Sequence, residues 1–121
     1  MSESPIRTAI LGYGRNGSSM HAGAVEHSDG FTMTAVCDTD SQRRDEAAAR
    51  FACPVYEDYH EMLASEDLDL VCVITRSDQH CEMACDCLTA GANVLVTKPW
   101  AADAAEARRM IDAAAASGRL L

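Results

Sequence analysis

Two things are scarce in this sequence: long apolar runs and basic residues. No apolar stretch approaches the roughly 20 residues that a helix needs to span a bilayer. Residues 1–5 are short and polar and show no signal peptide, so we expect a cytoplasmic protein. Lys and Arg number 10 against 19 Asp and Glu, which gives a net charge of −9. This balance argues against nucleic acid or an anionic membrane as a partner, because both bind basic patches.

Disulfides and metal ligands are not expected either, although six cysteines are present. Cys37 and Cys72 lie inside apolar runs, where a reduced cysteine packs as a small apolar side chain. Cys81, Cys85 and Cys87 share one predicted helix. At about 100° per residue, Cys87 points nearly opposite to the other two, so the three thiols cannot converge on one ion. We therefore predict reduced cysteines and no metal site.

What the sequence does contain is a glycine-rich turn at the end of an apolar run, Gly12-x-Gly14-x-x-Gly17. The first glycine allows a sharp turn out of a strand, the second lets a diphosphate approach the backbone, and the third lets the next helix pack closely on the sheet. Asp38 closes the next apolar run, where its carboxylate would accept hydrogen bonds from the hydroxyls of an adenosine ribose. Together these features predict a dinucleotide-binding site.

The start of the helix after this turn is the predicted phosphate site. Free backbone N–H groups there would face the phosphates, aided by the helix dipole. Arg15 and Asn16, between the second and third glycines, belong to this predicted cofactor-binding loop.

Strand and helix patterns alternate along the chain. Apolar runs predict strands over residues 6–11, 31–37, 55–56, 70–75 and 93–96. Amphipathic segments and capping residues predict helices over residues 16–27, 40–51, 59–64, 78–90 and 103–118. Residues 119–121 resemble the start of a sixth strand. This alternation predicts an α/β fold, a doubly wound parallel sheet of the Rossmann type in a three-layer α/β/α arrangement.

Helix ends and buried faces are predicted from the same pattern. Asp40 is the expected N-cap of the second helix, Pro54 ends that helical region, and Gly91 stops the fourth helix. Asp103 and Glu106 form a capping-box pattern at the start of the last helix. The residues expected on the buried faces are Met20 and Ala24 in the first helix; His80, Ala84, Cys87 and Leu88 in the fourth; and Ala104, Ala107, Ile111 and Ala114 in the last.

A doubly wound sheet binds its ligand at the carboxyl ends of the strands, around the point where the strand order reverses. In this sequence those ends are residues 12–17, Asp38, residues 75–80 and residues 97–100. Every unusual motif in the chain falls at one of these four places, so the predicted fold and the predicted site agree.

Five short segments carry a resemblance to a known family. They are Gly12-Tyr-Gly-Arg-Asn-Gly17, His21-Ala22, Ala35-Val-Cys-Asp38, Ile74-Thr75 with the later His80, and Ala90-Gly-Ala-Asn-Val-Leu-Val-Thr-Lys-Pro99. Over essentially its whole length, the chain resembles the amino-terminal domain of the glucose-fructose oxidoreductase / inositol dehydrogenase (Gfo/Idh/MocA) family. The family's last segment usually reads Ala-Gly-Lys-His-Val-Leu-x-Glu-Lys-Pro, and here Thr97 replaces the glutamate. The family often has proline where this chain has Arg76.

This resemblance implies a domain that binds NAD or NADP in an enzyme that oxidises or reduces sugars, polyols and related carbonyl compounds by hydride transfer. It also implies a second, larger α/β domain, which holds the substrate on an open antiparallel sheet and through which homo-oligomers form. The family's main acid and base, an Asp and a His, belong to that second domain. We therefore expect residues 1–121 to be a truncated cofactor domain without a complete active site.

By the same resemblance, Lys98 would be the catalytic residue of this domain. It would reach the substrate hydroxyl or the nicotinamide region, where an ammonium stabilises the oxygen that becomes alkoxide-like as hydride leaves carbon. His80 matches a family position near the nicotinamide. Thr97, in place of the family's glutamate, keeps a hydroxyl but lacks the negative charge. The alternatives are a packing or capping role for His80 and a plain surface position for Lys98.

NAD is expected in preference to NADP, because the carboxylate of Asp38 would repel a 2′-phosphate. Arg43 and Arg44 follow closely and could soften this preference. Thr75 and Arg76 are expected to contact the ribose and diphosphate of the cofactor, although Arg76 could instead pair with a surface acid.

Two other classes of function stay open. One is a stand-alone NAD(P)-binding or sensing module without catalysis, whose exposed sheet edge a partner chain would cover. The other is a methyltransferase, which also uses a glycine-rich first turn and an acid after the second strand. The Lys98-Pro99 pair weighs against it, because methyl transfer gives that lysine no task. A nicotinamide-dependent oxidoreductase is therefore the leading hypothesis.

Overall fold

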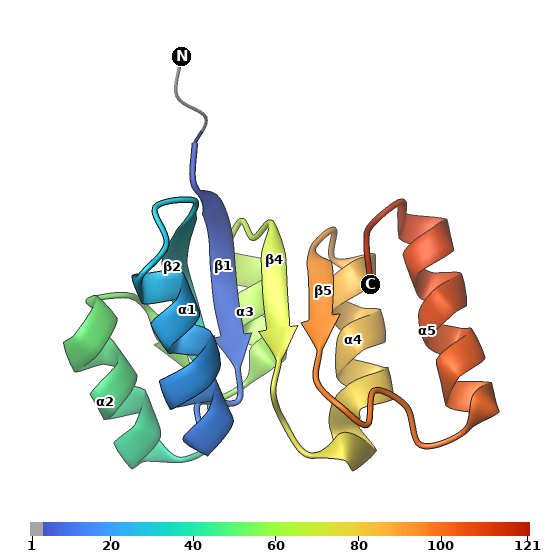
Figure 1. Ribbon diagram of the computed structural model, residues 1–121, viewed down its shortest axis with the longest axis horizontal. Coiled ribbons are helices and arrows are strands. Elements are labelled where there is room, and N and C mark those ends of the chain that lie inside the picture. Colours follow the sequence, from blue (N-terminus) through green and yellow to red (C-terminus); the bar gives the residue numbers. More distant parts are fainter. Residues whose placement is uncertain (1–3) are drawn as a thin grey trace.

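The computed structural model describes residues 4–121 and shows a parallel five-stranded sheet with helices on both faces (Figure 1). The strands are β1 (Ile6–Leu11), β2 (Phe31–Cys37), β3 (Val55–Tyr56), β4 (Leu70–Val73) and β5 (Asn93–Val96). Their order across the sheet is β3-β2-β1-β4-β5, and every neighbouring pair is parallel. The order reverses between β1 and β4, which confirms the predicted doubly wound α/β fold.

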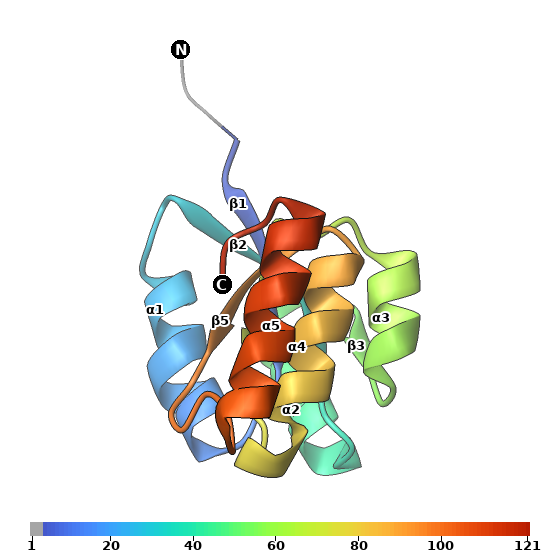
Figure 2. The same ribbon diagram turned by 90° about the vertical axis from the view of Figure 1, so that its right-hand side faces the viewer.

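Helices form the two outer layers. They are η1 (Gly17–His21), α1 (Ala22–Glu26), α2 (Ser41–Phe51), α3 (Tyr59–Ser65), η2 (Ser77–Gln79), α4 (His80–Thr89) and α5 (Ala104–Ser117). Figure 2 shows α1 on one side of the sheet and α3, α4 and α5 on the other. In residues 4–121, none of the helices combines the length and the apolarity that crossing a membrane requires.

Each face of the sheet has its own core, because successive side chains of a strand point to opposite faces. On one face Ile10 and Cys72 pack with Ala22 of α1 and Ala47 of α2. The other face carries the larger cluster, in which Ala9, Leu11, Val71 and Val73 of the strands pack with Met62 of α3, Leu88 of α4 and Met110 of α5. Strands buried on both faces explain the near-continuous apolar runs of the sequence.

Aspartate side chains start three of the helices. The N-caps of α2, α3 and α5 are Asp40, Asp58 and Asp103, and each accepts a hydrogen bond of 2.9 Å from a backbone N–H two or three residues later. Glu106 completes the cap of α5 but accepts from the N–H of Ala102 instead of that of Asp103. At the other end, Gly118 takes a left-handed φ of 69° and ends the helix, as predicted.

The first helix is in the predicted place, but its buried face is not the predicted one. It begins with a π-helical turn, η1, which holds more residues per turn than an α-helix and so rotates the residues that follow. Ala22 and Val25 are therefore buried, whereas Met20 is 65% exposed and Ala24 faces solvent. The expectation that Met20 and Ala24 face the core was wrong.

The buried face of α5 also differs from the prediction. Met110 is fully buried, whereas Ile111 is 45% exposed and Ala104 lies in solvent. The cause is that α5 packs mainly on α4, as Figure 2 shows, and reaches the core of the sheet through Met110. Its apolar stripe turns toward that helix, with Ala107 and Ala114 half-buried at its margins. For α4 the predicted face, including His80 and Leu88, is confirmed.

Three predicted boundaries need correction. β4 ends at Val73, two residues early, because the chain turns away to pass the glycine turn. α4 begins at His80 after the 3₁₀ turn η2. Residues 119–121 form no strand, although the carbonyl of Leu120 accepts a hydrogen bond from the N–H of Val94 at 2.9 Å and so lies along the outer edge of β5.

Candidate cofactor site

The glycine turn lies between the carboxyl ends of β1, β2 and β4. The N–H of Gly12 donates to the carbonyl of Cys37 at 2.8 Å, and its φ of 99° is a left-handed value that favours glycine. A Cβ at Gly12 would lie 2.8 Å from the carbonyl oxygen of Ile74, so the turn runs against the loop after β4. A Cβ at Gly17 would lie 2.0 Å from the carbonyl oxygen of Gly12. Both positions therefore require glycine.

Polar groups of the loop itself support the helix start. The N–H of Ser18 donates to the carbonyl of Gly14 at 2.8 Å, and the hydroxyl of Ser19 donates to the carbonyl of Arg15 at 2.6 Å. Arg15 and Asn16 are exposed. Their side chains stand at the surface beside the turn, and their predicted contact with the phosphates stays a prediction.

Arg50 of α2 holds the helix start from the other side. Its guanidinium donates to the carbonyl of Ser18 at 2.6 Å and to the hydroxyl of Tyr13 at 3.0 Å, and it pairs with Glu26 at 3.0 Å. This hydrogen bond from Arg50 lowers the pKa of the Glu26 carboxyl. Arg50 could not be predicted from the sequence, because its partners lie 24 to 37 residues away and no local pattern marks it.

Asp38 lies at the end of β2, where its carboxylate is tied to the glycine turn. One carboxylate oxygen accepts a hydrogen bond from the N–H of Tyr13 at 2.8 Å, and the other accepts from the N–H of Asp40 at 2.9 Å. The residue is 8% exposed. A carboxylate has about four acceptor positions, so Asp38 can still accept from a ligand.

Arg43 of α2 stands beside this carboxylate. Its guanidinium lies 3.7 Å from the nearer carboxylate oxygen of Asp38. A Cβ at Gly14 would lie 3.4 Å from the same guanidinium. The side chain is half exposed. Arg44, the next residue, points elsewhere and donates to the carbonyls of Asp38 and Thr39 at 3.0 Å. Of the two arginines, Arg43 is therefore the one placed to meet a ligand.

A cavity of about 710 Å³ opens at the carboxyl ends of the strands. Its volume falls within the roughly 300–1,000 Å³ of typical small-molecule sites. The predicted site residues that line it are Gly12, Gly14, Asp38, Thr75 and Arg76. The predicted residues that lie outside its lining are Arg15, Asn16, Gly17, His80, Thr97 and Lys98.

The far wall of the cavity is formed by residues that were not among the predicted site residues. Glu57, Asp58 and Tyr59 follow β3 and line the cavity opposite the glycine turn. The available signal was the predicted strand over residues 55–56, because residues that follow any strand of a parallel sheet reach the same edge. The hydroxyl of Tyr59 donates to Asp86 at 2.6 Å, and burial together with that carboxylate raises the pKa of Tyr59. Burial raises the pKa of the Cys37 thiol, another lining group, to about 12, so it stays protonated at neutral pH.

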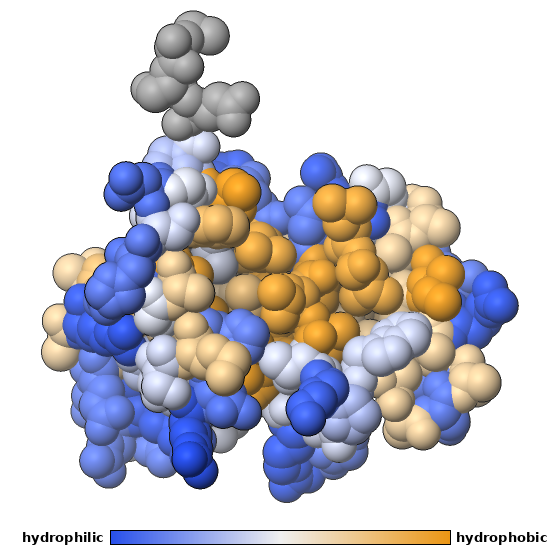
Figure 3. Space-filling model, in the orientation of Figure 1, coloured by the Kyte–Doolittle hydropathy of each residue, from blue (hydrophilic) through white to orange (hydrophobic). Residues whose placement is uncertain are grey.

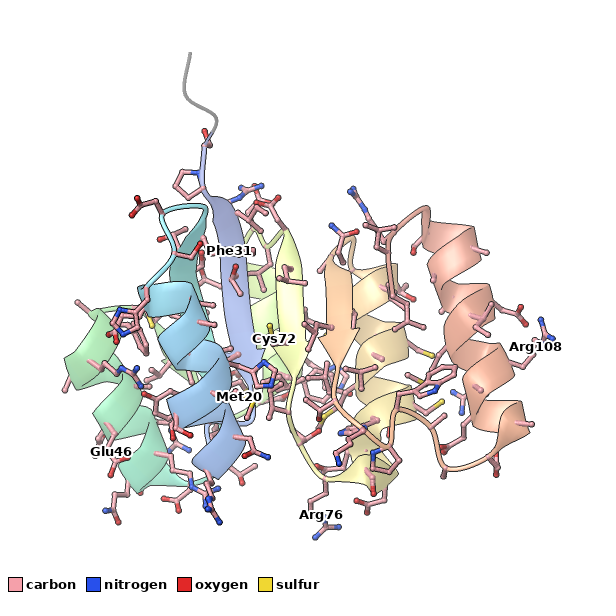
Figure 4. The ribbon with its side chains drawn as sticks, in the orientation of Figure 1. Met20, Phe31, Glu46, Cys72, Arg76 and Arg108 are labelled. Atoms are coloured by element: carbon pink, nitrogen blue, oxygen red, sulfur yellow. The ribbon has the colours of Figure 1, made fainter. Side chains whose placement is uncertain are left out.

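The loop after β4 forms the remaining rim. The hydroxyl of Thr75 donates to the sulfur of Met83 at 3.3 Å. Arg76 points outward at the lower edge of the molecule (Figure 4) and pairs with Asp78 at 2.8 Å. Both side chains of this pair are exposed, at 79% and 63%, so the surface-acid alternative for Arg76 is realised. Breaking so exposed a pair costs little, and Arg76 stays available to a diphosphate.

Lys98 lies apart from this cavity. It lines a second hollow of about 650 Å³ together with Leu95, Trp100, Ile111 and Leu121. Figure 3 shows the broad apolar area over β4 and β5 to which this hollow belongs, on the face where α1 and α2 cover only the other strands. The peptide bond between Lys98 and Pro99 is cis, and the N–H of Thr97 donates to the carbonyl of Val73 at 3.3 Å.

His80 is buried behind the rim, with 1% of its surface exposed. Its ring nitrogens lie 2.9 Å from the carbonyl oxygens of Pro99 and Thr75. The packing alternative accounts for this arrangement, and the predicted contact of His80 with the cofactor stays a prediction. Elsewhere in residues 4–121, no group of three or more His, Cys, Asp or Glu side chains could hold a metal ion.

A doubly wound parallel sheet, an obligatory glycine turn and an acid beside a cavity at the carboxyl ends define a dinucleotide-binding domain. Comparisons with known proteins agree. The model of an oxidoreductase family with an NAD-binding Rossmann fold, GFO_IDH_MocA, matches residues 6–121. The chain therefore belongs to the Gfo/Idh/MocA family of oxidoreductases and is its NAD-binding Rossmann domain.

Three relatives illustrate the match. Inositol 2-dehydrogenase of Salmonella typhimurium is 28% identical over 94% of this chain and 34% of its own length. The WlbA dehydrogenase from Bordetella pertussis, solved with NADH and UDP-GlcNAcA, superposes with a TM-score of 0.91 at 28% identity over 98% of this chain and 36% of its own. A 3-ketoreductase from Actinomadura kijaniata, solved with NADP and TDP-benzene, superposes with a TM-score of 0.91 at 29% identity over 98% of this chain and 36% of its own. The chain thus spans about a third of the length of these relatives.

Proposed function

We propose that the 710 Å³ cavity binds NAD and that the chain serves an enzyme acting on a sugar, a polyol or a related carbonyl compound. The observation that carries the proposal is the position of Asp38, whose carboxylate faces the cavity while hydrogen bonds hold it against the glycine turn. A carboxylate held there can accept hydrogen bonds from both hydroxyls of a ribose. The substrate class rests on relatives such as the inositol 2-dehydrogenase.

The preference for NAD follows from the charge at the ribose. The Asp38 carboxylate repels a 2′-phosphate, whereas the Arg43 guanidinium at 3.7 Å attracts one. Arg43 is half exposed and Asp38 is fixed by two backbone hydrogen bonds, so the arginine can turn to a phosphate without disturbing the acid. We therefore expect tighter binding of NAD and measurable binding of NADP.

Lys98 is the residue we propose for catalysis. It lines the apolar hollow together with Trp100, and a cation beside apolar surface can stabilise a negative charge that develops on the substrate. A bound nicotinamide ring supplies the hydride acceptor or donor of the reaction. Lys98 would hold the oxygen of the reacting carbon and stabilise it as it becomes alkoxide-like. The acid and base of the reaction would come from outside these 121 residues.

The apolar hollow supports a covering domain. Leu95, Trp100, Ile111 and Leu121 are each 40–45% exposed on one side of the sheet, and contiguous apolar surface of this kind marks an interface. We propose that the substrate-holding domain implied by the longer relatives packs here, with Lys98 at the junction. Homo-oligomer formation would then involve that second domain.

The experiment that tests cofactor binding is calorimetric titration of this chain with NAD and NADP in parallel. NAD should bind saturably and more tightly than NADP, and Asp38→Ala should abolish the preference and weaken NAD at least tenfold. Arg108→Ala, which removes an outward-pointing charge on α5 (Figure 4), is the control and should change neither affinity. Binding of S-adenosylmethionine but of neither dinucleotide would overturn the proposal.

Arg43→Ala separates the two cofactors. Loss of charge-assisted hydrogen bonds to the 2′-phosphate should cost about 1.5–3 kcal/mol, roughly 10- to 100-fold in NADP affinity. The affinity for NAD should change much less. Equal weakening of NAD and NADP binding would mean that Arg43 contacts a part of the adenosine that both cofactors contain.

Lys98 can be tested on the same chain with ADP-ribose, which lacks nicotinamide. Lys98→Met should lower the affinity for NAD but leave the affinity for ADP-ribose unchanged, because Lys98 lies outside the cavity that would hold the adenosine. An equal effect on both ligands, or on neither, would show that this lysine does not reach the nicotinamide region.

A further inference from the structure

The glycine turn contains an asparagine that is followed directly by a glycine, Asn16-Gly17. In such a pair the backbone nitrogen of the glycine can attack the side-chain amide carbon of the asparagine, because glycine has no Cβ to hinder the approach. The attack forms a five-membered ring and releases ammonia. Water then opens the ring at one of its two carbonyls, which leaves aspartate or isoaspartate. The reaction needs only water, so the local sequence already contains both reacting groups.

Both reacting groups lack a hydrogen-bonding partner in the folded chain. Asn16 is exposed, and its side chain makes no hydrogen bond to the helix start that it precedes. Within residues 4–121, no hydrogen bond has the N–H of Gly17 as its donor. No contact of this kind therefore has to break before the ring can form.

Asn93, the other asparagine of the chain, has the opposite surroundings. Its side-chain amide donates to the carbonyl of Asp69 at 2.9 Å, and its side-chain oxygen accepts from the N–H of Leu120 at 2.9 Å. The next residue is the β-branched Val94, whose side chain crowds the attacking nitrogen. Asn93 is thus an internal reference that should not react.

The backbone of the turn makes the reaction at Asn16 depend on local opening. Asn16 has a helical ψ of −37°, which holds the nitrogen of Gly17 away from the side-chain amide carbon. Gly17 is buried, and a Cβ there would lie 2.0 Å from the carbonyl oxygen of Gly12, so the packed turn leaves no room for rotation. Ring closure therefore requires η1 to open, and local openings of this kind are more frequent than global unfolding.

We propose that Asn16 is a site of spontaneous deamidation, and that the carboxylate formed there lowers the affinity of the chain for the diphosphate of a dinucleotide. The second half rests on the proposed function. Asn16 belongs to the predicted phosphate-binding loop, where Arg15 and Arg43 supply positive charge. A carboxylate at this position repels the phosphates and competes with them for the two cations. A bound dinucleotide, in turn, keeps the turn closed and protects the asparagine.

The two products differ in their effect on the fold. Aspartate suits the start of a helix, because a negative charge is favourable at that end of the helix dipole, so this product should remain folded. Isoaspartate adds one carbon to the main chain directly before Gly17, which packs against the carbonyl of Gly12. The isoaspartate form should therefore lose stability as well as affinity.

The first test measures the modification without a nucleotide. The chain is incubated in mildly alkaline buffer, with and without urea, and is then digested with pepsin in acid, where the reaction stops. Mass spectrometry should find NH₂ replaced by OH at Asn16 in both samples, faster in urea, and no change at Asn93 in the folded chain. Asn16→Gln should not react on this time scale, because its longer side chain would have to form a six-membered ring. An unchanged Asn16 in the folded chain, once the chain in urea has reacted, would overturn the proposal.

The second test uses Asn16→Asp as the product itself. Calorimetry should show an affinity for NAD that is lower by roughly tenfold or more, and the difference should shrink as salt is added. Ala105→Asp is the matched control, because it adds the same charge at an exposed position in the first turn of α5, outside the lining of the cavity. Thermal unfolding of both variants should match that of the unsubstituted chain. Equal NAD affinity of Asn16→Asp and the unsubstituted chain would refute the effect on binding.

Protection by the cofactor is the third result. If only the closed turn binds NAD, the rate at Asn16 falls by the factor 1 + [NAD]/Kd, which is about tenfold at roughly nine times the Kd. An unchanged rate in a chain that calorimetry shows to be saturated would refute the link between binding and opening. A chain that binds no NAD would refute the proposed function and the effect on affinity, whereas the mass measurement would still decide whether Asn16 is modified.

Discussion

Two aspartates that flank strands at opposite ends of the sheet have different partners. Asp69 precedes β4 at the amino end and accepts three hydrogen bonds of 2.9–3.0 Å from Arg7, one from its N–H and two from its guanidinium. Asp38 follows β2 at the carboxyl end and accepts only from two backbone N–H groups, with the nearest cation, Arg43, at 3.7 Å. The first acid has its ionic partner within the chain, whereas the second still has acceptor capacity beside a cavity.

The two ends of the sheet differ as a whole in the same way as these two aspartates. At the amino end, Arg7 also pairs with Asp67, so the polar groups there satisfy one another. At the carboxyl end, a glycine turn, a half-exposed arginine and the fixed Asp38 surround 710 Å³ of open space. Internal pairing contributes to stability, and incomplete pairing leaves groups free to bind a ligand.

The largest effect should come from the turn that shapes the carboxyl end. Gly17→Ala forces a Cβ to 2.0 Å from a backbone oxygen, so it should lower the free energy of unfolding by about 3 kcal/mol or more, measured by urea denaturation. Gly23→Ala is the matched control, because nothing lies within 4 Å of a Cβ at this position in α1. Gly23→Ala should be neutral or stabilise by up to about 1 kcal/mol. Equal loss in both variants would contradict the close packing of the helix start.

The next effect concerns Asp38 itself. Asp38→Asn replaces one of two acceptor oxygens by a donor, leaving the N–H of Tyr13 or Asp40 without its partner in a buried place. We expect a loss of about 1–3 kcal/mol in the free energy of unfolding. Affinity for NAD should fall as well. Unchanged stability with lost affinity would mean that the carboxylate serves the ligand alone.

The smallest effect should come from Asp69. Its side chain and that of Arg7 are 38% and 43% exposed, so solvent screens the pair, and Asp69→Asn should cost less than about 1 kcal/mol. Affinity for NAD should not change, because Asp69 lies at the opposite end of the sheet.

The same pair makes a prediction about acid. The hydrogen bonds from Arg7 lower the pKa of the Asp69 carboxyl from 3.8 to about 2. A lowered folded-state pKa gives stability that is complete above about pH 4 and is lost as the pH falls toward 2. Thermal unfolding across this range should show a steeper loss in the unsubstituted chain than in Asp69→Asn. Asp112→Asn on the exposed side of α5 is the control, and an identical loss in all three proteins would exclude a contribution from the pair.

Local chemistry explains why much of the fold could be predicted from the sequence. Buried parallel strands need apolar residues on both faces, an N-cap needs a short acceptor such as Asp40, and a helix end suits Gly118. These requirements act within a few residues. Strand positions, most helix limits and the glycine turn were therefore correctly predicted.

The errors lie where a helix departs from regular α-helical geometry or packs on another helix. The π-helical turn η1 rotates the first helix and exposes Met20, and the packing of α5 on α4 buries Met110 in place of Ile111. Neither is visible in a pattern of apolar residues, because that pattern assumes a regular α-helix that packs on the sheet.

The sequence by itself determined the doubly wound sheet, the dinucleotide turn and the acid that follows β2, since each is set by residue type at short spacing. Only the tertiary structure decided that Arg43 stands beside Asp38, that Arg50 holds the helix start, and that His80 bridges the loops of Thr75 and Pro99. The sequence placed both Arg43 and Arg44 near Asp38 without deciding between them, whereas Arg50 and its partners lie 24 to 37 residues apart and His80 and Pro99 lie 19 apart. Folding of the chain brings these residues together, so their contacts can be identified only when the order of the strands is known.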